Sequence, residues 1–297
     1  MRDGFAGYNP IVVFIYYMVV LGTTMFIMNP ATISVALTGA AVYYLYIKKM
    51  EGIRLVSGLI PLLVIVALIN GLFNHRGATL LFYLPGDNPF TVEAMIYGLF
   101  AGMMLAAVIL WFGSFNQVFT PEKLLYVIGR RFPSLGMVIC LVFTLVPGYR
   151  RQAGKISEAR KALLGNEKYD STNLGTGRLN KIKIALSDFD SLTGWALENS
   201  ITRADSMRAR GYGSGKRSHY SAFRFKRRDL LLLLAIFVST TVFLERIATG
   251  GFKSSYYPWV EFRVDSLGMM AYIILCLIPV IISIQEDLIW LRLKSKI

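Results

Sequence analysis

The chain has 297 residues, of which 55% are apolar or aromatic and only 17% are charged, and its net charge is +14. Soluble domains carry about a quarter charged residues, so this composition argues against a soluble enzyme and against a disordered chain. Two cysteines are too few for a disulfide framework or a cysteine-rich metal site. With a mean hydropathy of +0.51, the sequence indicates an integral membrane protein.

Six apolar stretches are long enough to cross a hydrocarbon layer, which takes roughly 20 helical residues. They are residues 10–28, 31–47, 54–73, 93–113, 229–249 and 266–289. Asn29 and Pro30 separate the first stretch from the second, and this two-residue break predicts a tight helical hairpin. The expected fold is therefore an all-α polytopic membrane protein with about six transmembrane helices.

Small residues recur at every fourth position of the fourth stretch. They are Ala94, Gly98, Gly102 and Ala106. Such a stripe lets two membrane helices approach closely. We expect it to contact another helix of the same chain rather than a partner.

Lysine and arginine are concentrated on one side of this six-helix arrangement. The segment 114–228 holds 21 of the 32 basic residues against 8 acidic ones, and further cations occupy the turn after residue 47 and the C-terminal tail. Because cytoplasmic loops are enriched in lysine and arginine, both termini are predicted to be cytoplasmic. The positive charge thus suits a membrane face, and no nucleic-acid partner is expected.

The segment 114–228 is expected to form a cytoplasmic and interfacial region between transmembrane helices in 1–113 and in 229–297. Residues 132–147 are apolar but short, and arginine pairs flank them, so we place them at the cytoplasmic boundary. A basic helix is expected from about Arg150 to Leu164, followed by a polar linker over 166–177. A second long helix is predicted from Arg178 to Arg210, with Gly211 as its C-terminal cap.

One face of the second long helix is apolar. Leu186, Phe189 and Leu192 recur three or four residues apart with Trp195 adjacent, which is the pattern of an amphipathic helix. An exposed apolar patch of this size marks a partner surface. The alternative is that the face packs on residues 132–147 of the same chain.

The sequence offers no catalytic or metal-binding arrangement. The loop Gly211–Arg217 lacks the spacing of a phosphate-binding loop and follows a helix rather than a strand. His75 and His219 are predicted on opposite faces of the membrane. We therefore expect no catalytic residue, no metal site and no cofactor.

Arg210 has three interpretations. It can complement the dipole at the end of its helix, or attract anionic lipids with its basic neighbours. It can also enter an acidic cleft of another protein, where its planar guanidinium makes contacts that lysine does not.

The end of this helix resembles a known family. Met207-Arg208-Ala209-Arg210-Gly211-Tyr212 is similar to the second Ala-Arg-Gly motif of the EcfT/CbiQ family, the transmembrane T components of energy-coupling factor transporters. The resemblance extends over the apolar segment ending at Pro147, the two long helices and their linker. It implies a multi-pass subunit of the plasma membrane without enzymatic activity.

The resemblance also implies partners and site residues. Two ABC-type ATPases would bind ATP, and Ala209, Arg210 and Gly211 would contact these ATPases. A small membrane S component would capture a vitamin or metal ion. Leu186, Phe189, Leu192 and Trp195 are the expected S-component contacts. The first motif departs from the family, because Leu163 and Leu164 stand where arginine and glycine belong. Arg160 or Lys161 could replace that arginine from a neighbouring helical position, and Arg160 is taken as the candidate.

Two other functions remain open. Glu158-Ala159 followed by Gly165 approximates the cytoplasmic-loop motif of ordinary ABC importer permeases. A polybasic membrane scaffold without a transport role is the second alternative. An ordinary permease would associate with ATPases and a soluble binding protein, whereas a scaffold would bring no ATPase.

Overall fold

The computed structural model describes residues 4–84, 88–164, 177–215, 223 and 225–294. The chain divides into two compact units, the first formed by Met1–Leu124 with Phe223–Ile297 and the second by Leu125–Ala222. The second unit begins later than the predicted coupling region, because the helix of the fourth stretch continues to Val118. The predicted linker up to residue 176 and His219 lie outside the described residues.

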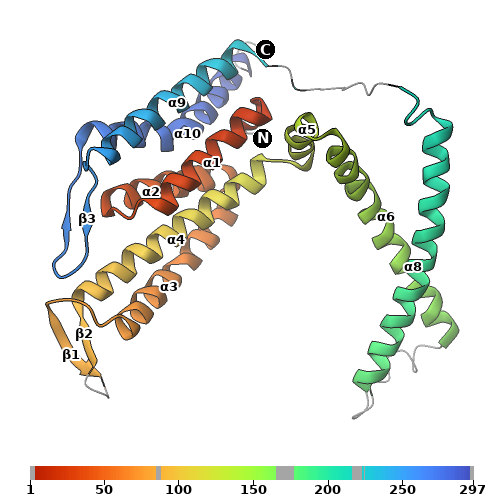
Figure 1. Cartoon of the computed structure of the whole chain (residues 1–297), viewed down its shortest axis with the longest axis horizontal. Coiled ribbons are helices and arrows are strands. Elements are labelled where there is room, and N and C mark those ends of the chain that lie inside the picture. The colour runs from red at the N-terminus through yellow and green to blue at the C-terminus, as the bar shows by residue number, and fades with distance from the viewer. Residues whose placement is uncertain (1–3, 85–87, 165–176, 216–222, 224, 295–297) are drawn as a thin grey trace. The chain divides into compact units, whose positions relative to one another are not determined.

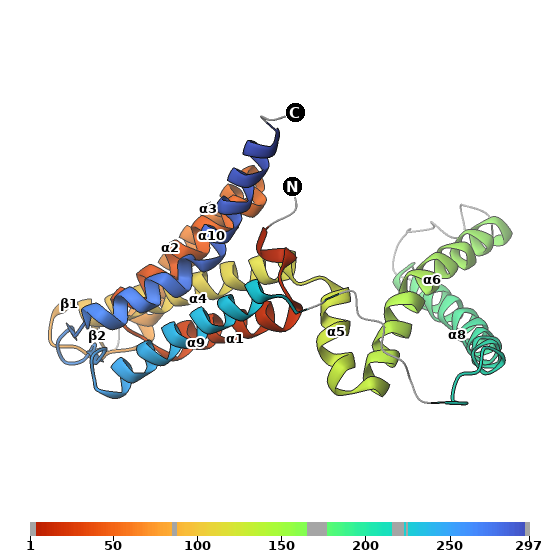
Figure 2. The same cartoon turned by 90° about the horizontal axis from the view of Figure 1, so that it is seen from above.

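The first unit is a bundle of long helices. In its described residues these are α1 (Pro10–Phe26), α2 (Pro30–Lys48), α3 (Met50–Phe73), α4 (Val92–Val118), α9 (Arg227–Ala248) and α10 (Ser266–Lys294), preceded by a short 3-10 helix, η1 (Gly4–Gly7). Helices α9 and α10 lie along one edge of the unit and α3 and α4 along the other, with α1 and α2 between them (Figures 1 and 2).

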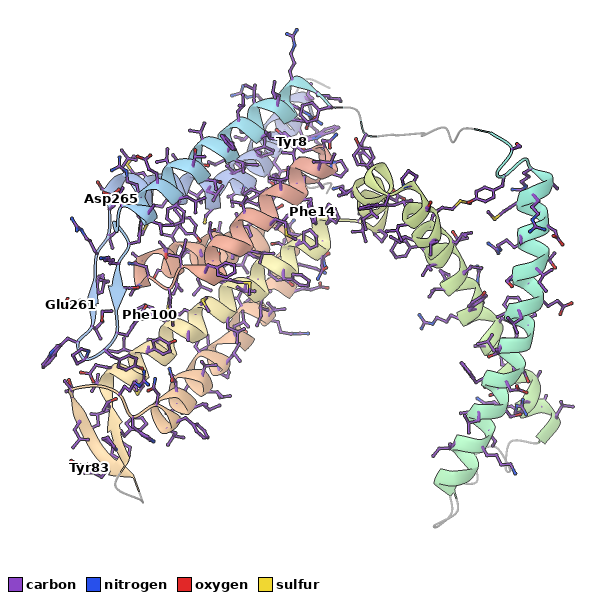
Figure 3. All side chains as sticks on the ribbon, in the orientation of Figure 1. Tyr8, Phe14, Tyr83, Phe100, Glu261 and Asp265 are labelled. Carbon is purple, nitrogen blue, oxygen red and sulfur yellow. The ribbon has the colours of Figure 1, made fainter. Side chains whose placement is uncertain are left out.

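Two short hairpins connect helices of this unit. Strands β1 (Leu80–Leu84) and β2 (Asn88–Thr91) pair antiparallel between α3 and α4. Strands β3 (Ser254–Ser255) and β4 (Glu261–Phe262) pair antiparallel between α9 and α10. Tyr83, Glu261 and Asp265 mark this hairpin end of the unit in Figure 3, and Tyr8 marks the opposite end.

An Asn-Pro pair starts each of the first two helices, and α1 and α2 then pack mainly on other helices of the unit rather than on each other as a tight hairpin. Asn9 Oδ1 accepts a hydrogen bond from the Ile11 amide (3.1 Å), and Asn29 Oδ1 accepts one from the Ala31 amide (3.0 Å). Proline then occupies the first helical position, where its missing N–H group costs nothing. The predicted break at Asn29 and Pro30 is therefore confirmed.

Six described helices are long and apolar enough to cross a membrane. They are α2, α3, α4, α9, α10 and a helix of the second unit, α6 (Pro133–Leu164). The chain is thus an all-α polytopic membrane protein. The first span was predicted over residues 10–28, but the helix observed there, α1, is shorter. Its 17 residues extend about 26 Å, and the backbone leaves the helix at Ile27.

Aromatic side chains fill the interior of the first unit. Phe5, Tyr16, Tyr17, Tyr43 and Trp111 are all fully buried. Their rings meet mainly edge to face, with Phe5 and Tyr16 centroids 5.2 Å apart and Tyr16 and Trp111 centroids 6.1 Å apart. The cluster joins η1, α1, α2 and α4, so it fixes the start of the chain to three helices.

The small-residue stripe of α4 is an internal helix contact, as predicted. A methyl group added at Gly98 would lie 2.8 Å from the Cα atom of Ala67 and 2.7 Å from the Cβ atom of Asn70, both on α3. At Gly102 the added atom would lie 3.3 Å from the Cα atom of Leu63. Glycine at these positions is what permits the backbones of α3 and α4 to approach.

Substitution of Gly98 by alanine should therefore destabilise the protein. Forcing a methyl group into this contact is expected to cost about 1–3 kcal/mol, as overpacking does elsewhere. The measurement is thermal unfolding in detergent. Gly58→Ala is the matched control, because nothing lies within 4 Å of its added methyl group and alanine favours a helix. Equal unfolding temperatures for both variants would contradict a tight α3–α4 contact.

The second unit is dominated by two helices, α6 and α8 (Gly177–Ala209). The shorter α5 (Pro121–Arg131) precedes them. We expected the apolar segment 132–147 and the basic helix 150–164 to be separate elements, but α6 runs through both without interruption. Pro147 inside it removes one backbone donor, and the helix continues on either side.

Candidate coupling surface

Helix α8 ends in a glycine-capped turn that positions Arg210. The Gly211 amide donates to the Arg208 carbonyl oxygen (2.9 Å), and the Tyr212 amide donates to that of Met207 (3.0 Å). Gly211 has a φ of +83°, which glycine adopts without strain. These two hydrogen bonds define a Schellman motif, so the predicted C-terminal cap at Gly211 is confirmed.

Arg210 stands at the last position before this reversal of the chain. Ala209, Arg210 and Gly211 are all exposed. Within the described residues, Arg210 takes part in no ion pair. Its exposed guanidinium group at the helix end is thus available to a partner, and its fork of donors suits a carboxylate.

The turn after Arg210 does not form a phosphate-binding loop in its described part. Ser214 folds back on Gly211, with both its amide (3.2 Å) and its hydroxyl group (2.7 Å) donating to the Gly211 carbonyl oxygen. The segment follows a helix end rather than a strand. Residues 216 and 217 of this loop lie outside the described residues.

Arg160 is engaged within the chain. Its guanidinium group forms an ion pair with Asp188 of α8, and one of its nitrogens lies 3.4 Å from the Ser191 hydroxyl oxygen. The side chains of Arg160 and Asp188 are only 25% and 20% exposed. Arg160 therefore joins α6 to α8 and orients the two long helices, a contact that sequence reasoning did not anticipate.

Reversing the charge of Arg160 should loosen this contact. Arg160→Glu places two carboxylates side by side, and a partly exposed pair of this kind is worth about 1 kcal/mol. Hydrogen exchange of the amides near residue 188 should then accelerate roughly fivefold. The double variant Arg160→Glu, Asp188→Arg should restore slow exchange, and Arg150→Glu is the control with the same charge change at an exposed site on α6. Fast exchange in the double variant would show that the ion pair does not hold the helices together.

The four predicted S-component contacts separate onto two faces of α8. Leu186 and Phe189 are exposed by 63% and 66%, whereas Leu192 is half-buried. The Trp195 ring packs edge to face on Tyr149 of α6, with centroids 5.7 Å apart. The four residues were grouped by spacing alone, but at 100° per residue Trp195 lies on the side of α8 that faces α6.

A different set of side chains forms the exposed apolar face of α8. It consists of Ile182, Leu186, Phe189, Leu197 and Ile201. These five positions fall within about 120° of the helix circumference at 100° per residue. Following the helical spacing of apolar residues in the sequence beyond Trp195 would have placed Leu197 and Ile201 on this face.

Other reactive groups of the described residues are dispersed. Cys140 is exposed and Cys276 is buried. His75 is half-buried, and its Nδ1 lies 3.3 Å from the Pro89 carbonyl oxygen. The described residues contain no group of three His, Cys, Asp or Glu side chains placed to hold a metal ion.

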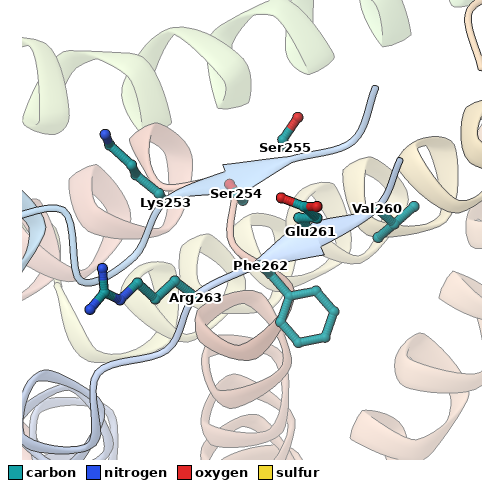
Figure 4. Close-up of a pocket in the computed structure, with 7 residues that line it drawn as sticks. All are labelled: Lys253, Ser254, Ser255, Val260, Glu261, Phe262 and Arg263. Carbon is teal, nitrogen blue, oxygen red and sulfur yellow. The ribbon is translucent and has the colours of Figure 1, made fainter. Parts of the chain in front are cut away.

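The hairpin end of the first unit carries a shallow hollow. Its volume is about 690 Å³, and Lys253, Glu261 and Arg263 line it along β3 and β4 (Figure 4). Nearby, the Tyr256 hydroxyl donates to the Met28 carbonyl oxygen (3.0 Å), and burial raises the pKa of Tyr256 to about 12. Tyr256 therefore keeps its proton at neutral pH and fastens this loop to the connection between α1 and α2.

Comparisons with known proteins do not assign the chain to a family. The sequence matches no protein-family model and no curated protein. Any assignment of function therefore rests on the residues themselves.

Proposed function

We propose that this chain is the transmembrane coupling subunit of an energy-coupling factor transporter. It would transmit conformational change from two partner ATPases to a small membrane S component that takes up a vitamin or a metal ion. One observation carries the proposal. The Ala209-Arg210-Gly211 motif ends a long helix in a Schellman turn that leaves the arginine exposed and unpaired among the described residues.

The roles of the two long helices follow from their exposed groups. Arg210 enters an acidic groove on one ATPase, where a bidentate contact fixes the helix end. The exposed apolar face of α8 receives the S component, with Leu186 and Phe189 as the retained members of the predicted set. Arg160 acts through α8, by holding it against α6, rather than through direct contact with an ATPase.

The orientation in the membrane rests on the distribution of charge. Lys49, Arg54, Arg227 and Arg292 lie at the end of the first unit remote from the two hairpins, and all are exposed. By the enrichment of lysine and arginine in cytoplasmic loops, this end faces the cytoplasm of the plasma membrane. Both termini are then on the side where ATP is available, and the chain needs no cofactor of its own.

Recovery of the tagged chain from its native host in mild detergent tests the proposal. Two related ATPases and one small hydrophobic subunit should accompany it, and the small subunit would indicate the substrate. ATPases with a soluble binding protein or a second permease would instead support an ordinary ABC importer. Absence of any ATPase, while other membrane complexes stay whole, would overturn the proposal and leave a membrane scaffold.

A further inference from the structure

A cationic hollow lies between the two long helices of the second unit. Its volume is about 350 Å³. Arg151 and Lys155 line it from consecutive turns of α6, and Arg203 lines it from α8. No acidic residue is among its lining residues, and within the described chain none of the three cations forms an ion pair. Three uncompensated positive charges in one hollow favour an anion.

The rest of the lining suits a phosphate ester at a membrane surface. Tyr149 and Trp195 pack against each other at an interplanar angle of 80° on one wall, and the amides of Gln152 and Asn199 add neutral donors. Tryptophan and tyrosine are enriched where hydrocarbon gives way to headgroups. The hollow therefore combines charge with the side chains of an interfacial site.

An apolar groove continues from this hollow. The groove has a volume of about 380 Å³ and shares the lining residues Leu145 and Arg203 with the hollow, so the two spaces are adjacent. Leu141, Met207 and Tyr212 provide most of the remaining apolar lining, and Arg208 of α8 also lines the groove. A ligand that fills both spaces needs an anionic end and a hydrocarbon end.

The position along α6 sets the depth of the site. Apolar side chains before Pro147 are exposed, at Phe132, Leu135, Val138, Val142, Phe143 and Val146. Cations begin at Arg150, one turn further on. Along α6 the two spaces span this boundary, with Leu141 and Leu145 on the apolar side of it and Arg151 and Lys155 on the other.

We propose that the paired hollows bind one anionic phospholipid. Its phosphate lies among Arg151, Lys155 and Arg203, and one acyl chain occupies the apolar groove. The adjacency of charge and groove favours a lipid over a soluble anion, which would use only the first hollow. The proposal does not depend on the coupling function.

Native mass spectrometry of the purified chain tests this site. The chain in neutral detergent is titrated with phosphatidylglycerol and with phosphatidylcholine of the same acyl chains. Phosphatidylglycerol should bind preferentially, and the triple variant Arg151→Gln, Lys155→Gln, Arg203→Gln should bind it on the order of a hundredfold more weakly, since each cation near an anionic lipid contributes about fivefold.

A charge-matched triple variant provides the control. Arg54→Gln, Arg150→Gln, Lys183→Gln removes the same charge from exposed positions outside the hollow and should keep most of the binding. Equal loss in both triples, or no preference for phosphatidylglycerol, would overturn the proposal. Displacement of the lipid by millimolar inorganic phosphate would show a soluble-anion site instead.

A second measurement needs no change in charge. Phosphatidylglycerol with brominated acyl chains should quench the fluorescence of Trp195, taken as the difference between the wild-type chain and Trp195→Phe. The quenching should exceed that from brominated phosphatidylcholine at the same concentration. Equal quenching by the two lipids would contradict a specific site, even where the triple variant fails to fold.

Discussion

Replacing Arg210 with glutamate is expected to strip the partner ATPases from the chain while leaving it in the membrane. The exposed guanidinium group would change from a bidentate donor into a carboxylate facing an acidic groove. Losing one partner of a desolvated charged contact costs about 2–5 kcal/mol, so ATPase recovery should fall roughly thirtyfold or more. Quantitative mass spectrometry of the detergent eluate, beside the wild-type chain, measures the loss.

Neighbouring arginines supply the controls for this experiment. Arg208→Glu changes the same charge on the last turn of the same helix, at an exposed position about 200° away around the helix axis, and should reduce recovery much less. Arg160→Glu should also have a smaller effect, because Arg160 acts through its ion pair with Asp188. Unchanged ATPase recovery with Arg210→Glu would contradict the role assigned to Arg210. If Arg160→Glu lowered ATPase recovery as much as Arg210→Glu, Arg160 would be a direct contact of the ATPase.

Local rules predicted those parts of the fold that short stretches of sequence control. Asn29 and Pro30 bend the chain through one side-chain hydrogen bond and one fixed φ angle, both encoded by adjacent residues. Gly211 ends α8 for a similarly local reason. The helix contact made by the stripe containing Gly98 could also be predicted, because residues four positions apart lie on the same face of a helix.

The errors occurred where the outcome depends on contacts distant in sequence. Pro147 and the arginines after it signal a boundary locally, but α6 continues through them. Arg160 and Asp188 are 28 residues apart, and no pattern within either helix indicates their pairing. The expectation that Trp195 shares one exposed face with Leu186 and Phe189 fails for the same reason, since the packing of Trp195 on Tyr149 depends on how α6 and α8 pair.

Replacing Asp229 with alanine should destabilise the first unit more than any surface change. This carboxylate is 1% exposed and accepts hydrogen bonds from two backbone amides, those of Lys226 (2.7 Å) and Asn9 (3.2 Å). One bond caps the start of α9, and the other joins it to the start of α1. Its removal leaves two donors without an acceptor at about 1–3 kcal/mol each, so we expect a loss of about 2–6 kcal/mol in the free energy of unfolding, measured by thermal unfolding.

Asp265 provides a matched control at the start of α10. It accepts a hydrogen bond from the Gly268 amide (3.0 Å), but its side chain is 31% exposed, so water can replace it and Asp265→Ala should cost only about 1 kcal/mol. Similar losses for the two variants would mean that the bond to Asn9 adds nothing to the cap. A larger loss for Asp229→Ala would show that one buried carboxylate holds the starts of α1 and α9 together, through a bond between residues 220 apart in the sequence.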